Sequence, residues 1–197
     1  MSSIKLKHSG GNSVIIAAPS SNPASDRTIT LPSNADGTML TTTNPKTGNI
    51  IQVLQAVKTD TFSTSSAGFS TITGLEISIT PSSSSNKILI HYDANVSGDD
   101  LSMVRLVRGS TAIAIGDASS SRQRITQGGQ FQGGNNDKVA VYSGSFLDSP
   151  SSTSSLTYKL QVYRHGGTIR VNTTFNDADA SYTGRGISTI TVMEVAG

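Results

Sequence analysis

Histidine is the residue type in this 197-residue chain best suited to acid–base chemistry, and the chain has three histidines and no cysteine. His91 stands two residues before Asp93, and a Ser-His-Asp triad needs such a pair beside an activated serine. His91 falls on an alternating strand, however, opposite to the apolar side, and no G-x-S-x-G turn occurs. His8 lies in an N-terminal arm and His165 in a turn. We therefore expect a protein that is not an enzyme.

A second candidate for chemistry is an oxygen-rich stretch near the C-terminus. Asp177, Asp179 and Ser181 have the D-x-D-x-S spacing that opens calcium loops. The sixth position of such a loop is glycine and the twelfth is glutamate, but here they are Tyr182 and Ser188. Asp and Asn also favour turns without any metal. The sequence thus predicts a turn at this point, with no metal and no cofactor.

The composition favours an ordered β-protein and narrows its partners. Charged residues are only 14% of the chain, while Ser, Thr, Ile and Val are abundant, and β-branched residues favour strands. The net charge is +2 and the 15 Lys and Arg residues are scattered, so no basic stripe for nucleic acid is present. No run approaches the ~18 apolar residues of a membrane span. Because the N-terminus has no signal peptide pattern, we expect synthesis in a cytoplasm and no membrane insertion.

Residues 49–197 carry the patterns of an all-β domain. KILIHYDANV alternates apolar and polar residues strictly from Ile88 to Val96, and GLEISIT and LTYKLQVYR alternate in the same way. Further strands are expected at IIQVLQAV, MVRLVRG, STAIAIG, KVAVYSGSFLD, TIRVN and GISTITVMEV. Gly166 and Gly167 predict a hairpin turn with positive φ at both glycines. Strands spaced this regularly, with no long helical pattern, predict an antiparallel jelly-roll sandwich.

Residues 1–48 are predicted to be an extended β-arm without a core of its own. Its short strands SIKLK, SVIIAA and RTITL are separated by glycine and proline, and isolated strand pairs are marginal in water. The arm must therefore lie against copies of itself, against the following domain or against a larger structure. The apolar residues that we expect to anchor it are Ile4, Leu6, Ile15, Ile29 and Leu31.

Two segments read as long surface loops, residues 117–137 and 147–155, because both are dense in Ser and Gly, with Asn and Gln in the first. The first loop places Arg122, Arg124 and Phe131 among flexible residues. Such a mixture can recognise a partner or a receptor, and it also suits a loop that is merely solvated. Both interpretations stay open at this point.

The arm phrase ITLPSNADGTMLTT resembles segments of structural proteins of tailed bacteriophages, especially those of marine and cyanobacterial hosts. Through KILIHYDANV, LTYKLQVYR and ISTITVMEV, the second region is similar to the jelly-roll knobs of such proteins and of the tumour-necrosis-factor and complement C1q trimers. The resemblance implies a homotrimer on the virion, made in the host cytoplasm, whose arm attaches to the particle. Burial of the arm's apolar side chains would stabilise that attachment by ~25 cal/mol per Å².

The resemblance leaves two roles open. In the first, the protein is a capsid decoration or cement protein that contacts the major capsid protein, or another virion protein, and stabilises the head shell. In the second, it is a short tail fibre or spike whose knob binds a host surface glycan or protein. The short arm favours decoration, because a fibre usually needs an attachment domain and a long shaft as well.

Overall fold

The computed structural model describes residues 3–7, 9–17, 20, 45–130 and 138–197. The chain divides into two compact units, Met1–Met39 and Leu40–Gly197. In the first unit, β1 (Ser3–Lys7) and β2 (Ser13–Ala17) form an antiparallel hairpin. The predicted third arm strand, with Ile29 and Leu31, lies outside the described residues, and the predicted boundary between residues 48 and 49 stays a prediction.

The second unit is built from antiparallel strands. They are β3 (Ile50–Lys58), β4 (Phe62–Thr64), β5 (Gly68–Ile79), β6 (Lys87–Gly98), β7 (Ser102–Arg108), β8 (Thr111–Ile113), β9 (Gln127–Gln130), β10 (Ala140–Asp148), β11 (Leu156–Arg164), β12 (Ile169–Val171) and β13 (Ser188–Val195). None of the residues that the structure describes belongs to a helix long and apolar enough to span a membrane.

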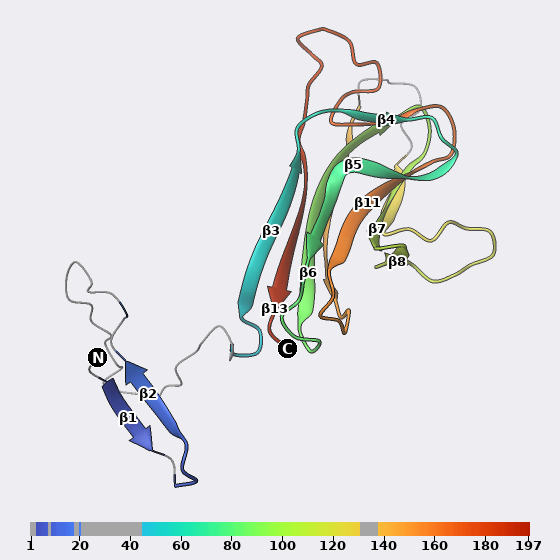
Figure 1. Ribbon diagram of the computed structural model, residues 1–197. Helices are drawn as coiled ribbons and strands as arrows, with labels where there is room; N and C mark the ends of the chain where they lie inside the picture. The colour runs from blue at the N-terminus through green and yellow to red at the C-terminus, as the bar shows by residue number, and fades with distance from the viewer. Residues whose placement is uncertain (1–2, 8, 18–19, 21–44, 131–137) are drawn as a thin grey trace, which may run out of the picture. The chain divides into compact units, whose positions relative to one another are not determined.

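These strands form two sheets packed face to face. The first sheet has the order β3-β13-β6-β12-β4, with β10 on the other edge of β6, and the second has the order β5-β11-β7-β8, with β9 also on β7. Figure 1 shows β3, β13 and β6 in one layer and β5, β11 and β7 in the other. Because the chain crosses repeatedly between the sheets, from β3 to β5, back to β6 and on to β7, the fold is an antiparallel jelly-roll sandwich, as predicted.

The core lies between the sheets and follows the alternation read from the sequence. In β6, the side chains of Ile88, Ile90 and Tyr92 are at most 4% exposed, while His91 between them is exposed. The predicted inward residues of β11, Tyr158, Leu160 and Val162, are fully buried. Leu75 and Ile79 of β5 pack against them from the same sheet. A period of two is therefore sufficient to identify the buried face of β6 and of β11.

Three local predictions were wrong. The loop 117–137 contains β9, because Gly128 allows close approach to β7: a Cβ on Gly128 would lie 2.8 Å from the Met103 backbone. The loop 147–155 begins later than predicted, since β10 continues to Asp148, which is buried with partners. In the β11–β12 turn only Gly167 has positive φ, at 62°, because one left-handed residue suffices there.

Candidate functional site

The surface of the first sheet that points away from the core, called the outer face below, carries an apolar row. Val53 of β3 pairs with Met193 of β13, Met193 pairs with Leu89 of β6, and Leu89 pairs with Leu147 of β10. The row thus crosses β3, β13, β6 and β10. Val53 is 53% and Leu147 46% exposed. Antiparallel sheets with one solvated face normally place polar residues there, so this row is unusual for a free surface.

The row next to it on one side of the outer face is polar. Thr191 of β13 pairs with His91 of β6, and Gln55 Nε2 donates a 2.8 Å hydrogen bond to Thr191 Oγ1. A hollow of about 320 Å³ lies here, lined among others by His91, Asp93 and Ser143. The outer face therefore has an apolar row beside a polar row that contains a hollow. Side chains of a partner can fit into this hollow.

The arm hairpin carries exposed apolar side chains on both of its faces. Ile4 pairs with Ile16, and Leu6 follows two residues later on the same face as Ile4. Ile15 pairs with Lys5 and lies on the opposite face, so the predicted anchoring residues do not share one surface. Ile16, at 52% exposure, belongs beside Ile4 and was missed by the prediction. A two-residue period would have identified it.

At one end of the sandwich, a buried asparagine holds three segments together. Asn172 is 1% exposed, and its Nδ2 donates to the backbone oxygens of Lys58, at 2.9 Å, and Asp60, at 3.0 Å. Its Oδ1 accepts a 2.6 Å hydrogen bond from Ser188 Oγ, and its backbone has a φ of 63°. Asparagine tolerates this left-handed geometry better than most residues. Asn172 therefore fixes the start of the β12–β13 loop against the β3–β4 corner.

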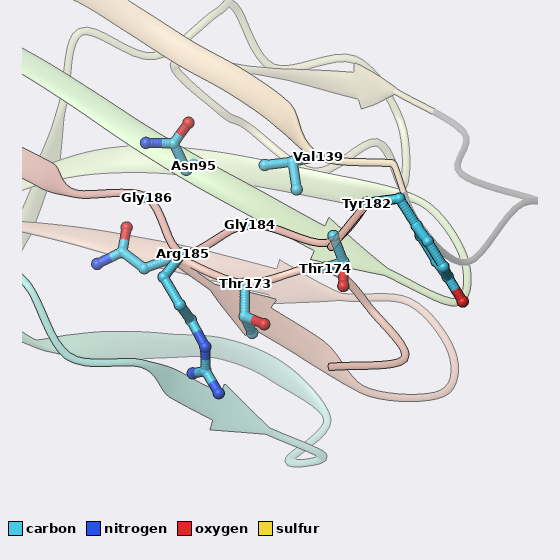
Figure 2. A pocket seen from close by; sticks show the side chains of 9 residues that line it. Asn95, Val139, Thr173, Thr174, Tyr182, Gly184, Arg185 and Gly186 are labelled. Carbon is cyan, nitrogen blue, oxygen red and sulfur yellow. The ribbon is translucent and has the colours of Figure 1, made fainter. Parts of the chain in front are cut away.

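A pocket of about 350 Å³ opens beside this asparagine. Asn95 of β6 and Val139, which precedes β10, line one side, and residues from the β12–β13 loop line the rest. Figure 2 shows the Tyr182 ring and the Arg185 side chain on either side of Thr174. Tyr182 is 75% exposed, whereas Thr174 is 4% exposed and its Oγ1 has no hydrogen-bond partner within the described part of the chain.

Asp177, the first residue of the stretch with calcium-loop spacing, forms contacts beside this pocket. Arg185 Nη2 lies 2.8 Å from Asp177 Oδ1, and the Thr173 hydroxyl donates to the same oxygen. Thr173 and Arg185 also form a backbone bridge. Across the described ranges, no group of three or more His, Asp and Glu side chains is arranged to hold a metal ion.

The histidines lie at separate places. His91 is exposed on the outer face, and His8 lies outside the described residues. His165 Nδ1 lies 2.8 Å from Asp100 Oδ2, a pair that was not predicted, and this contact holds the pKa of Asp100 below its ordinary value. The pair joins the β6–β7 turn to the β11–β12 turn, which the hydrogen bond from Asp99 N to Thr168 O also connects. The His165–Asp100 pair therefore holds two turns together.

The predicted receptor loop is held by its own contacts. Arg122 Nη1 donates to Ser119 Oγ at 2.7 Å, and Arg124 Nε donates to the Gly116 oxygen at 2.8 Å. Both arginines are exposed, and Phe131 lies outside the described residues. The loop therefore presents two cations two residues apart in sequence, each hydrogen-bonded to another residue of the loop.

Two buried acids stabilise the sandwich. Burial raises the pKa of Glu194, but hydrogen bonds from Asn86, Gln52 and Ser82 outweigh it and hold that pKa below its ordinary value. Asp148 Oδ2 accepts from Tyr158 Oη and from Arg108 Nη1, both at 2.6 Å. Burial, together with the hydrogen bond to Asp148, raises the pKa of Tyr158 above its ordinary range.

No family model matches the chain, and none of the curated proteins matches it. Among solved structures, it is similar to that of infectious bursal disease virus, Gt strain, at 13% identity and a TM-score of 0.37, over 95% of this chain and 48% of that one. The structure of the Gx strain is similar at 14% identity and a TM-score of 0.35, over 93% of this chain and 53% of that one. The structure of a mutant VP2 protein of the same virus is similar at 14% identity and a TM-score of 0.35, over 87% of this chain and 41% of that one.

The chain thus spans about half the length of the viral proteins that it matches. The assignment of the jelly roll rests on the strand order and the core described above.

Proposed function

We propose that the protein is a structural subunit of a bacteriophage virion, a capsid decoration protein that stabilises the head shell as a homotrimer. The observation that carries the proposal is the apolar row on the outer face, from Val53 through Met193 and Leu89 to Leu147. Copies of the chain that cover this row remove it from water, which contributes ~25 cal/mol per Å² of apolar surface. The homotrimer itself is taken from the resemblance to trimeric knobs.

The arm supports attachment to a particle. Its hairpin exposes Ile4 and Leu6 on one face and Ile15 on the other, and among the described residues of the arm it is a two-stranded pairing. Such a hairpin gains stability when a neighbouring surface covers it or when another strand adds to its edge. In the decoration role, the major capsid protein or another virion protein supplies that surface, and the jelly-roll knob stays folded on its own core.

The experiment that tests this role is a measurement of location and copy number. The chain is quantified against the major capsid protein in purified particles by mass spectrometry with labelled peptide standards. A shell-covering decoration protein is expected at hundreds of copies per particle, and disrupted particles should retain it on heads. A few copies up to a few dozen, found on tails, would contradict the decoration role.

A second candidate function, a short tail fibre or spike that binds the host surface, is favoured by the pocket beside Tyr182. The pocket lies at one end of the sandwich, between loops, where binding residues often lie on a rigid scaffold. The copy-number measurement separates the two roles, because a tail position predicts the lower stoichiometry.

A further inference from the structure

We propose that the pocket beside Tyr182 binds an uncharged sugar ring, held between the exposed tyrosine and the Arg185–Asp177 pair. The inference goes beyond the decoration role, and it stands whether the subunit lies on a head or on a tail, because it rests on the pocket alone. The pocket's volume of about 350 Å³ lies at the lower end of the range of small-molecule sites, roughly 300–1,000 Å³.

The charges at the pocket favour an uncharged ligand with hydroxyl groups. Arg185 is the charged residue among those that line the pocket, and Asp177 lies 2.8 Å from it. A phosphate or carboxylate ligand would meet the guanidinium and the carboxylate together, so its attraction to one is offset by repulsion from the other. A sugar hydroxyl both donates and accepts, so neighbouring hydroxyls can accept from Arg185 and donate to Asp177.

The tyrosine supplies the apolar part of a sugar site. The Tyr182 side chain is 75% exposed, the highest value among the large hydrophobic side chains in the described part of the protein. A pyranose ring has one face made mainly of C–H groups, and an exposed aromatic face binds such a surface by dispersion and by its quadrupole. Covering this ring also removes apolar surface from water.

The lining is preorganised by contacts within the loop. Gly186 N donates to the Asn172 oxygen at 3.2 Å, and Thr183 Oγ1 donates to the Ala178 oxygen at 2.6 Å. Together with the Thr173–Arg185 bridge, these bonds fix the backbone on both sides of the pocket. A site that is ordered before binding loses less conformational entropy when the ligand arrives.

Two polar atoms at the pocket can form further hydrogen bonds. Asn95 Nδ2 donates to the Ile187 oxygen at 2.6 Å, and within the described ranges nothing hydrogen-bonds Asn95 Oδ1. Thr174 Oγ1 is buried without a partner among the described residues, a state that is unfavourable for a polar atom. A rotation about its Cα–Cβ bond exchanges the hydroxyl and the methyl group, and a polyhydroxylated ligand can then satisfy it.

The test is ligand-observed saturation-transfer NMR on the purified full chain. The probes are glucose, galactose, mannose, N-acetylglucosamine, fucose and rhamnose, with glucuronic acid and inorganic phosphate as charged competitors. We expect at least one neutral sugar to bind and the two charged probes not to bind. Tyr182→Ala should weaken binding about tenfold, while Tyr182→Phe keeps the ring and should change affinity by less than about threefold.

Two further variants separate the pocket from general surface effects. Arg185→Ala should weaken neutral-sugar binding, and the matched control Arg124→Ala, an exposed arginine of another loop, should not. Asp177→Asn keeps a residue that tolerates the φ of 50° at this position but removes the negative charge, so it should admit glucuronic acid. The proposal is overturned if no neutral sugar binds, or if binding persists unchanged in both Tyr182→Ala and Arg185→Ala.

Discussion

Asn86 and Glu194 lie 108 positions apart in the chain, and the Asn86 amide donates a 2.5 Å hydrogen bond to Glu194 Oε1. The same oxygen accepts from Ser82 N at 2.6 Å, and Gln52 Nε2 donates to Oε2. Glu194 is fully buried on β13, so its negative charge is stabilised by donors from β3 and from the β5–β6 turn. This carboxylate therefore holds three separate segments at one end of the sandwich.

The lowered pKa of Glu194 predicts sensitivity to acid. Because the folded state favours the ionised form, this stabilisation is full above the ordinary pKa of 4.5 and is lost as the pH falls toward the folded pKa. Glu194→Gln should reduce the free energy of unfolding at pH 7 by roughly 2–4 kcal/mol, and the difference from wild type should shrink below pH 4.5. Urea unfolding at several pH values measures it. The exposed Glu76→Gln is the control, and a difference independent of pH would contradict the assignment.

Tyr158 predicts a matching loss of stability at high pH. Its side chain is fully buried, and the raised pKa means that the folded state favours the neutral phenol. This contribution is full below the ordinary pKa of 10.0 and is lost as the pH rises above it. Tyr158→Phe should lower stability at pH 7 by about 1.5–3 kcal/mol, because the Asp148 carboxylate loses a donor. Thermal unfolding checks this, with the exposed Tyr182→Phe expected to be neutral.

The outer face predicts the oligomeric state. Leu147 is part of the apolar row and is half exposed in the single chain, so Leu147→Asp should leave the sandwich folded but should prevent its copies from packing there. Light scattering coupled to gel filtration should give a wild-type mass three times that of the 20.5 kDa chain, and a single-chain mass for the variant. Ser110→Asp, at an exposed turn, is the control. A wild-type protein that runs as a single chain would refute assembly through this face.

The arm predicts which substitutions release the protein from particles. Ile4→Asp and Ile16→Asp change side chains that lie opposite each other on one hairpin face, and Ile29→Asp and Leu31→Asp test the two predicted anchoring residues of the third arm strand. Each should reduce occupancy on particles at least tenfold while the melting temperature of the knob stays unchanged. Western blots of purified particles measure occupancy, with Lys7→Gln as the control. Wild-type occupancy in all four variants would show that anchoring lies elsewhere.

Alternation in the sequence predicted the core, because the burial of Ile88, Ile90 and Tyr92 depends only on the period of two within one strand. The apolar row could not be predicted in this way. Val53, Met193, Leu89 and Leu147 come from four strands, and a register slip of one residue on any of them would break the row. The register between strands that are distant in sequence is fixed by tertiary packing, and no local sequence pattern predicts it.

The geometry of the pocket could not be predicted, for a related reason. The stretch from Asp177 to Ser188 was considered as a metal loop because of its acids, but the geometry of the pocket comes from the pairing of Asp177 with Arg185 and from the exposure of Tyr182. The buried state of Asp148 was likewise hidden, since its partners Arg108 and Tyr158 lie on other strands. An aromatic residue two positions before a glycine in a polar loop is the local signal that could have indicated the site.

The position of β13 has a consequence for how the protein is made. This strand is the last one in the chain, yet it lies between β3 and β6 in the middle of its sheet. On the ribosome, β3 therefore has no neighbour in its sheet until Val195 has emerged from the exit tunnel, and the nascent chain keeps Ile88 and Ile90 uncovered on one side. Closure of the core therefore has to wait until β13 has been synthesised, and chaperones that hold exposed strands can bind β3 and β6 before then.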